Sequence, residues 1–298
     1  MSAPVAVIVN ASAGAGCTAE WAEKLTGLFR AAGMEVAVTL AADGAQIVEA
    51  AKRAVAAGAR LVAAGGGDGT INAVASVLVG TEVALGVLPL GTLNHFAKDL
   101  KLPLELEDAV TVIAAGHVAQ VDVGEVNQRI FLNNSSIGLY PDIVRDRERQ
   151  QRRLGRGKWL AFFWATLTML RAYPFLRVRL SLDGHDIERR TAFVFVGNND
   201  YVLEGFDIGE RARLDGGHLS LYTTQRTGRV GLLRLALRAL LGRLRQARDF
   251  DALRAREITV ETHHAQLRVA TDGEISPMAT PLHYRIRPGA LRVRVASA

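Results

Sequence analysis

The spacing of apolar residues changes near residue 122, and this change restricts the fold of the chain more than any other feature. Before it, short apolar runs alternate with stretches whose apolar residues repeat at helical spacing. The expected elements are strand 5–9, helix 19–32, strand 35–40, helix 45–57, strand 61–64, helix 72–79, strand 83–88 and helix 108–115. Because strands and helices that alternate in this way form βαβ units, we expect a parallel sheet with helices on both faces.

Beyond residue 122 the apolar residues alternate one by one, as in Val178–Leu182, which runs into the turn pair Asp183-Gly184. The further strands expected are 192–196, 218–223, 257–261, 266–270, 283–286 and 291–295, with helices near 159–172 and 230–246. Many short alternating strands predict an antiparallel sandwich or barrel, and we take the sandwich as the expected fold. The predicted fold is a parallel α/β domain, 1–122, followed by an antiparallel β-sandwich domain, 123–298, whose C-terminal strand is a candidate to return to the first domain.

The run Gly65-Gly66-Gly67-Asp68-Gly69-Thr70 lies directly between a predicted strand and a predicted helix. Consecutive glycines let the backbone approach a ligand closely, and the following helix adds its positive N-terminal dipole, so the two together can form a phosphate cradle. A carboxylate there would repel phosphate unless a cation lay between them, so Asp68 suggests Mg²⁺ or a group near the transferred phosphoryl. The structural alternative is a glycine-rich turn with a helix-capping aspartate.

Two further loops follow predicted strands, Asn10–Gly16 and Gly91–Asn94. Loops at the carboxyl ends of parallel strands converge on one crevice, so we expect all three loops to face one ligand. Gly14-x-Gly16-x-x-Ala19 also fits a dinucleotide fingerprint, but the next strand ends in Val38-Thr39-Leu40 without the acidic residue that would bind ribose. A dehydrogenase is therefore the runner-up on these residues.

Four motifs in this order resemble the diacylglycerol kinase catalytic family: Asn10–Gly14, the glycine run, Pro89–Ala97 (PLGTLNHFA) and Asp272-Gly273-Glu274. The resemblance covers nearly the whole chain, and relatives of the family include bacterial soluble lipid kinases, sphingosine kinases and, more distantly, NAD kinases and phosphofructokinases. It implies a two-domain lipid kinase that uses ATP and Mg²⁺, with Asp68, Asp272 and Glu274 as catalytic residues. The ATP-binding residues it implies, together with the loops above, are Asn10, Ala11, Ser12, Ala13, Gly14, Thr39, Gly65, Gly66, Gly67, Asp68, Gly69, Thr70, Ile71, Thr92 and Asn94.

Two positions depart from the family pattern. The family commonly has Asn-Asp where this chain has Asn94-His95, and Leu-Asp-Asp-Gly where it has Leu214-Asp215-Gly216-Gly217. The second motif holds a structural Mg²⁺ in the family, so here Asp215 is left as a weak metal ligand without its neighbouring carboxylate.

A basic segment precedes an aromatic one in the second predicted domain. The chain carries a net charge of +6, which suits an acidic partner. Basic residues beside tryptophan and phenylalanine are typical of an interfacial membrane helix, expected near 159–172, that binds anionic phospholipid. The residues concerned are Arg152, Arg153, Arg156, Trp159, Phe163 and Trp164. A helix packed on the β domain is the structural alternative, and the absence of a recognition motif argues against nucleic acid.

The function expected is Mg²⁺-dependent transfer of the γ-phosphoryl group of ATP to a lipid hydroxyl at a membrane surface, with diacylglycerol as the leading substrate in phospholipid metabolism. The alternatives are an NAD kinase-like enzyme with a soluble substrate and a catalytically weak regulator that binds nucleotide and lipid. A single cysteine, Cys17, and no apparent signal peptide favour a cytoplasmic, peripherally attached protein. The oligomeric state stays open, with a homodimer as one alternative.

Overall fold

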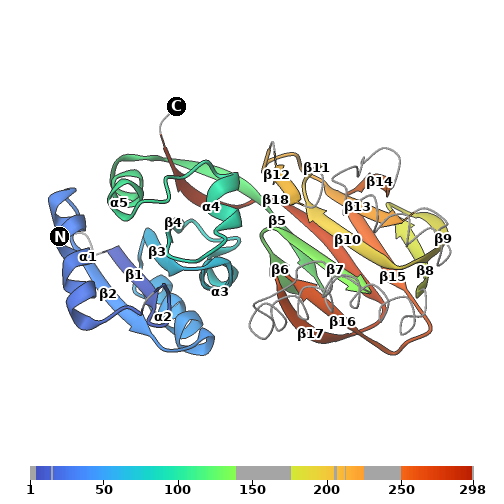
Figure 1. Cartoon of the computed structure of the whole chain (residues 1–298), viewed down its shortest axis with the longest axis horizontal. Coiled ribbons are helices and arrows are strands. Elements are labelled where there is room, and N and C mark those ends of the chain that lie inside the picture. The colour runs from blue at the N-terminus through green and yellow to red at the C-terminus, as the bar shows by residue number, and fades with distance from the viewer. Residues whose placement is uncertain are drawn as a thin grey trace, which may run out of the picture. The chain divides into compact units, whose positions relative to one another are not determined.

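The computed structural model describes residues 5–14, 16–138, 176–204, 207–211, 213–224 and 250–296. The chain divides into two compact units (Figure 1). The first comprises Met1–Val123, Arg213–Gly216 and Arg287–Ala298, and the second comprises Gly124–Ala212 and Gly217–Ile286. The helices expected near 159–172 and 230–246 lie outside the described residues.

The first unit alternates strands and helices, as its sequence predicts. Its elements are β1 (Val5–Asn10), α1 (Ala19–Ala31), β2 (Val36–Ala41), α2 (Gly44–Ala56), β3 (Leu61–Gly66), α3 (Asp68–Leu78), β4 (Ala84–Pro89), α4 (His95–Asp99) and α5 (Leu106–Ala115). The strands run in the order β2-β1-β3-β4 and each neighbouring pair is parallel. The final part of β18 (Leu282–Val295) pairs with β4, also in parallel, with Arg292 opposite Ala84.

Helices cover both faces of this sheet. On one face α1 packs with α5, and on the other α2 packs with α3. Val7, Val9, Ala63 and Leu88 of the strands join Phe29 of α1 in a buried cluster on the first of these faces. Because helices cover the strands on both sides, the sequences of the strands are continuous apolar runs. All residues of β3 and β4 are buried.

Helix α3 begins at Asp68, four residues before the helix that the sequence pattern predicts. Glycine, aspartate and threonine have low helix propensity, so the pattern placed residues 68–71 in a loop. In the structure Gly67 is the N-cap, and Thr70 and Ile71 are buried within the first turn. Tertiary packing and the favourable position of an acidic residue at a helix N-terminus outweigh the low propensity.

The second unit is built from antiparallel strands. They are β5 (His117–Val126, whose first residues belong to the first unit), β6 (Arg129–Phe131), β7 (Asn134–Gly138), β8 (Leu176–Leu182), β9 (His185–Thr191), β10 (Phe193–Asn198), β11 (Tyr201–Glu204), β12 (Asp207–Arg211), β13 (Leu219–Thr224), β14 (Phe250–Ala255), β15 (Glu257–Glu261), β16 (Gln266–Thr271) and β17 (Glu274–Ala279). One sheet has the order β14-β13-β10-β7-β16-β17, and a second contains β18-β15-β8-β9.

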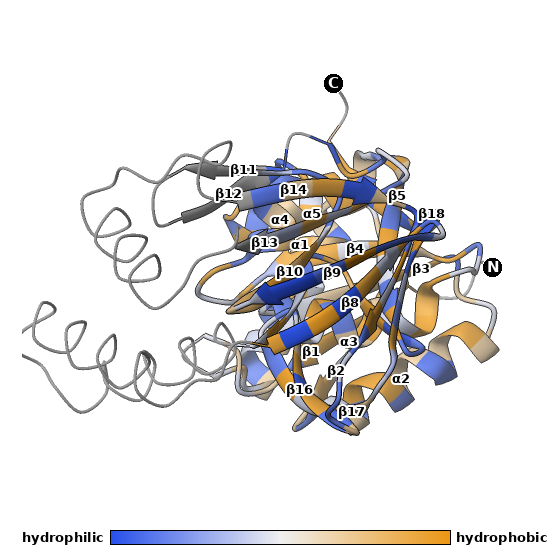
Figure 2. Cartoon of the chain, turned by 90° about the vertical axis from the view of Figure 1, so that its right-hand side faces the viewer, coloured by the Kyte–Doolittle hydropathy of each residue, from blue (hydrophilic) through white to orange (hydrophobic). Residues whose placement is uncertain are grey.

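Side chains from both sheets share one core, as expected of a β-sandwich. Leu180 of β8 and Tyr284 of β18 meet Val196 of β10 and Leu221 of β13 in a single buried cluster. Figure 2 shows hydrophobic and hydrophilic residues following one another along β8, which agrees with its alternating burial. The alternation read from the sequence is therefore the inward and outward alternation of half-buried strands.

Strand β18 corrects one prediction. The sequence pattern gave two strands, 283–286 and 291–295, separated by Pro288-Gly289. The structure has a single strand across both. Gly289 adopts a positive φ of 57° there, and its N–H donates to Oδ1 of the buried Asp122 at 2.9 Å, so the backbone group that the irregularity would leave unsatisfied has a partner.

Candidate functional site

The three loops singled out from the sequence follow three adjacent strands. β3 pairs with β1 on one side and with β4 on the other, and all three are parallel. The segments at their carboxyl ends are Asn10–Gly14, Gly65–Ile71 and Gly91–Asn94, and they therefore lie at the same end of the sheet. In the second of them, Gly65 and Gly66 end β3, Gly67 is the N-cap, and residues 68–71 form the first turn of α3. Thr39 lies on the neighbouring strand β2, opposite Ile8, and is exposed.

Asn10 joins the first loop to the second. Its Nδ2 donates to Oγ1 of Thr70 at 3.3 Å, and its Oδ1 accepts the N–H of Ser12 at 2.9 Å. Gly66 lies against the same threonine, because a Cβ built on Gly66 would be 2.4 Å from Thr70 Oγ1. The contact requires glycine at this position, so part of the glycine run is explained by packing within the loop.

Asn94 shapes the third loop from inside. It is buried, adopts a left-handed backbone with φ of 50°, and its Oδ1 accepts the N–H of Gly91 at 3.0 Å. Its Nδ2 donates to the carbonyl oxygens of Gly91 at 2.8 Å and Pro89 at 3.2 Å. The neighbouring Thr92 is exposed. Asn94 therefore fixes the loop backbone, and Thr92 is the accessible polar side chain of this loop, next to the exposed Leu93.

The second and third loops touch through glycine. A Cβ built on Gly91 would be 2.4 Å from Cα of Gly67, so neither backbone leaves space for a side chain at Gly91. Asp68 makes the second connection between the loops. Its Oδ1 accepts the N–H of Phe96 at 3.0 Å and its Oδ2 accepts the N–H of His95 at 3.2 Å, at the start of α4. The carboxylate of Asp68 is thus held in a fixed orientation by the first two backbone N–H groups of α4.

In the second unit, Asp272 and Gly273 form the tight turn between β16 and β17, with φ of 47° and 87°. This is the hairpin that Asp-Gly predicts on its own. The carboxylate does more, however, because it accepts three backbone N–H groups. Oδ2 accepts from Leu132 at 2.7 Å, and Oδ1 accepts from Asn133 at 2.8 Å and Asn134 at 3.0 Å.

Glu274 lies two residues farther along and is mostly exposed. Its Oε2 forms an ion pair with the guanidinium of Arg129 at 2.6 Å, and Arg129 also donates to Oγ of Ser276 at 2.9 Å. The structure therefore places Asp272 and Glu274 on one hairpin of the second unit, with different surroundings. Asp272 is held by backbone, and Glu274 by one accessible arginine.

A second Asp-Gly turn in this unit has the same geometry. Asp183 and Gly184 join β8 to β9 with φ of 47° and 87°, and Oδ1 of Asp183 accepts the N–H groups of Arg256 at 3.0 Å and Glu257 at 2.9 Å. In both turns the aspartate carboxylate thus accepts backbone N–H groups of a neighbouring segment. Any functional difference between Asp272 and Asp183 must come from what surrounds them.

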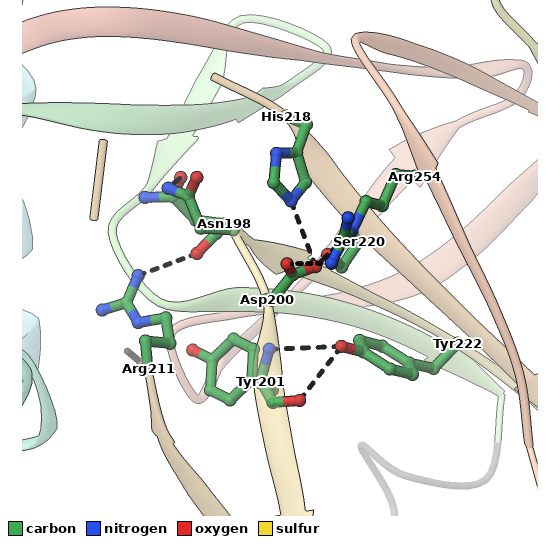
Figure 3. A network of polar contacts seen from close by, with 9 residues as sticks. Asn198, Asp200, Tyr201, Arg211, His218, Ser220, Tyr222 and Arg254 are labelled. Atoms are coloured by element: carbon green, nitrogen blue, oxygen red, sulfur yellow. Dashed lines mark hydrogen bonds and ion pairs between the residues drawn. The ribbon is translucent and has the colours of Figure 1, made fainter. Parts of the chain in front are cut away.

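A polar cluster in the second unit was not anticipated from the sequence. Asp200 lies at its centre (Figure 3) and contacts Oγ of Ser220 at 2.5 Å, Nη2 of Arg254 at 2.7 Å and Nε2 of His218 at 3.1 Å. Burial alone would raise the pKa of Asp200, but hydrogen bonds from Ser220, His218 and Arg254 outweigh it and lower the pKa. These residues are spread along the sequence, so only the strand pairing brings them together.

Asp215, the predicted weak metal ligand, is exposed and pairs with Arg213, whose Nε lies 3.0 Å from Oδ1. The hydrogen bond from Arg213 lowers the pKa of Asp215. Within the described ranges, no three histidine, cysteine, aspartate or glutamate side chains gather closely enough to hold a metal ion. An arginine is therefore the partner of the carboxylate here.

The predicted membrane residues lie outside the described part of the chain. They are Arg152, Arg153, Arg156, Trp159, Phe163 and Trp164. Among the residues that the structure describes, no helix has both the length and the apolar character needed to cross a membrane.

Comparison with protein families gives two consecutive matches. Residues 4–126 match the diacylglycerol kinase catalytic domain, and residues 141–295 match the YegS C-terminal NAD kinase beta sandwich-like domain. The two matches correspond to the α/β and the antiparallel β parts of the fold.

Curated relatives and solved structures agree with these matches. The chain is 31% identical over 273 residues to a probable lipid kinase YegS-like protein of Pseudomonas syringae pv. tomato, covering 89% of this chain and 86% of the relative. It is 29% identical over 178 residues to a diacylglycerol kinase of Staphylococcus carnosus, covering 59% of this chain and 57% of the relative. A putative diacylglycerol kinase from Bacillus anthracis has the same fold, with a TM-score of 0.76 at 24% identity over 98% of this chain and 96% of that one.

Proposed function

The chain belongs to the lipid kinase family defined by the diacylglycerol kinase catalytic domain, and on this premise we propose that it phosphorylates a hydroxyl group of a membrane lipid with ATP. Diacylglycerol is the first candidate substrate. The observation that supports the proposal most directly is the end of the first unit's sheet, where three glycine-containing loops from adjacent strands are joined by Asn10–Thr70, by Asp68 and by the Gly67–Gly91 contact.

This arrangement fits a polyphosphate. Gly65, Gly66 and Gly67 carry no side chain that would keep a phosphate from the backbone, and α3 begins directly after them. The first N–H groups of a helix lack partners within the helix and attract anions. Because Asp68 would repel those same phosphates, a divalent cation is needed beside it, and Mg²⁺ bound with the phosphates would neutralise their charge. Asp68 already has a fixed orientation, so it can present one carboxylate to such an ion.

We assign the other half of the chemistry to the hairpin of the second unit. Phosphoryl transfer to a hydroxyl requires an acceptor for the hydroxyl proton. Asp272 suits that role because its carboxylate is oriented by three N–H donors, whereas Glu274 is exposed and its ion pair with Arg129 can rearrange. We therefore assign the proton acceptor to Asp272 and a supporting electrostatic role to Glu274.

The basic and aromatic segment that contains Arg152 and Trp159 supports action at an anionic membrane surface. We propose that this segment binds the bilayer that holds the lipid substrate. Replacing Trp159, Phe163 and Trp164 by alanine should reduce sedimentation with vesicles containing anionic phospholipid while ATP binding is kept. Equal sedimentation of the variant and the parent chain would argue for a packing role instead.

The decisive experiment is transfer of radiolabelled phosphate from ATP to a panel of lipids in mixed micelles, with NAD as a soluble acceptor. We expect label on a lipid hydroxyl, dependent on Mg²⁺. Asp68→Asn should lose at least about tenfold in kcat, which corresponds to about 1.4 kcal/mol. Asp43 is a matched control, because it also caps a helix N-terminus, that of α2, and Asp43→Asn should keep full activity.

Label on NAD and on no lipid would replace the proposal by the NAD kinase-like alternative. ATP and lipid binding without transfer to any acceptor would favour the regulator. Retention of full activity by Asp68→Asn would remove Asp68 from the mechanism.

A further inference from the structure

Arg211, at the end of β12, is a buried arginine that the proposed reaction does not yet use. Only 3% of its surface is exposed. Its Nη1 donates to the carbonyl oxygens of Leu132 at 2.7 Å and Asn198 at 3.1 Å, and its Nη2 donates to Oδ1 of Asn133 at 2.8 Å. Its guanidinium carbon also lies 5.5 Å from the ring centre of Tyr201 (Figure 3). Burying a guanidinium costs several kcal/mol unless protein dipoles replace its hydrogen bonds to water. The hydrogen bonds that Arg211 makes with Leu132 and Asn133 therefore need an explanation.

The segment that Arg211 binds is the one that orients Asp272. Arg211 contacts the carbonyl oxygen of Leu132, and the N–H of Asn133, which belongs to the same peptide unit, donates to Oδ1 of Asp272 at 2.8 Å. In a trans peptide the C=O and the N–H point in opposite directions. The Leu132–Asn133 peptide thus lies between a cation and an anion, with its carbonyl toward the cation and its N–H toward the anion, which is the favourable alignment of its dipole.

Asn198 supports the same peptide. Its Nδ2 donates to the carbonyl oxygen of Leu132 at 2.8 Å, and its backbone N–H donates to the carbonyl oxygen of Asn133 at 2.9 Å. The segment is therefore held on its carbonyl side by Arg211 and Asn198 and on its N–H side by Asp272.

The Asp183 turn provides an internal comparison. There the N–H of Glu257 donates to Oδ1 of Asp183, and the carbonyl oxygen of Arg256, in the same peptide unit, accepts the backbone N–H of Ile286 at 3.0 Å. The donor behind the peptide is a neutral amide. The two turns share their backbone angles, and in both the carboxylate accepts backbone N–H groups, three at Asp272 and two at Asp183. Between these two turns, a buried cation contacts the carbonyl side of the peptide only at Asp272.

We propose that Arg211 is a positioning residue for Asp272, acting through the Leu132–Asn133 peptide. This rests on the proposed function, in which Asp272 accepts the proton of the lipid hydroxyl. A proton acceptor must come within hydrogen-bonding distance of its donor, and a displacement of about 1 Å can cost about a hundredfold in rate. Arg211 fixes the peptide whose N–H groups set the direction of the Asp272 carboxylate, without touching the substrate itself.

The test is a double-mutant cycle on kcat and on KM for ATP. Arg211→Met should lower kcat at least about tenfold and change KM for ATP by less than about twofold, because an orientation effect acts on the chemical step. Asp272→Asn should lower kcat on its own. In the Asp272→Asn background, Arg211→Met should then cause less than about a twofold further loss.

Hydrogen exchange and two conservative variants separate positioning from general stability. The amides of Leu132–Asn134 should exchange faster in Arg211→Met, while those of Arg256 and Glu257 are unchanged. Asp183→Asn is the matched control: it loosens the other turn and should leave kcat within about twofold of the parent. Should Arg211→Met fail to fold, Arg211→Lys, which keeps the charge, should retain more kcat than Arg211→Gln, which keeps a donor without charge.

Equal losses from Arg211→Met in both backgrounds, or equal kcat for Arg211→Lys and Arg211→Gln, would overturn the positioning role while leaving the proposed function intact. Full activity of Asp272→Asn would instead show that Asp272 is not the proton acceptor. Failure of the proposed function is therefore distinguishable from failure of the positioning role of Arg211.

Discussion

Gly91→Ala tests whether the contact between the second and third loops of the first unit sets the geometry of the proposed phosphate-binding site. A Cβ at this position would lie 2.4 Å from Cα of Gly67. Two carbon atoms make favourable contact only near 3.5–4.0 Å, so the loops would have to separate by about 1 Å. We expect a loss of about 1–3 kcal/mol in the free energy of unfolding, typical of overpacking, and a loss of about a hundredfold in kcat/KM for ATP.

Thermal unfolding and steady-state transfer of labelled phosphate measure the two effects. Gly27→Ala is the matched control, because Gly27 lies within α1 and a Cβ there would meet no atom within 4 Å. This variant should stabilise the protein by about 0.5–1 kcal/mol, the ordinary gain of alanine over glycine within a helix, with unchanged activity. If Gly91→Ala unfolds at the same temperature as the parent chain and keeps its kcat/KM, the Gly67–Gly91 contact does not set the distance between the two loops and the reasoning is wrong.

Three further predictions concern stability. Asp43→Ala should lower the free energy of unfolding by about 1 kcal/mol in denaturant titration, because Oδ1 of Asp43 caps α2 through the N–H of Gln46 at 2.9 Å; no change would show that the cap is dispensable. The pKa of Asp200 is lowered in the folded protein, so the stability it contributes is present above the ordinary aspartate pKa and is lost as pH falls through the lowered value. Asp200→Asn should therefore flatten the fall of the melting temperature below about pH 4, and a parallel fall in both proteins would refute this. Finally, Mg²⁺ without nucleotide should leave the melting temperature of the parent chain unchanged, because Asp215 is paired with Arg213. Gly216→Asp should make the melting temperature rise with Mg²⁺. A melting temperature of the parent chain that falls on addition of EDTA would contradict the first expectation.

The sequence predicted the larger features of the fold because they depend on periodicity. The change of apolar spacing near residue 122 indicated a parallel α/β part and an antiparallel β part, and both are present. The sequence also predicted that the three loops lie at one end of the sheet, because the loops that follow the carboxyl ends of parallel strands meet there. The interruption predicted in β18 was wrong, because a distant carboxylate, that of Asp122, satisfies the backbone at Gly289.

The sequence could not reveal which polar side chains form hydrogen bonds with backbone groups of other segments. Asp68 was predicted from its place in the glycine run, and Asn94 and Asp272 from the family resemblance. Each also holds a loop through hydrogen bonds to backbone groups, and for Asp68 and Asp272 these belong to distant segments that the sequence pattern does not connect with them. Arg211 and Asn198 gave no signal at all, since a buried arginine looks like a surface arginine until its partners are known. Whether the predicted site residues act in catalysis stays a prediction that the experiments above address.

Strand β18 has a consequence for how the protein is made. The first unit contains residues from both ends of the described chain, because the end of β18 pairs with β4. During synthesis β4 is therefore left with an unpaired edge while the whole second unit is translated, which takes on the order of ten to thirty seconds at bacterial and eukaryotic rates. An exposed strand edge is a site for wrong pairing with other chains. A gene fragment encoding residues 1–122 alone should accordingly give an aggregation-prone product, and the first unit is better studied with residues 287–296 supplied or within the 298-residue chain.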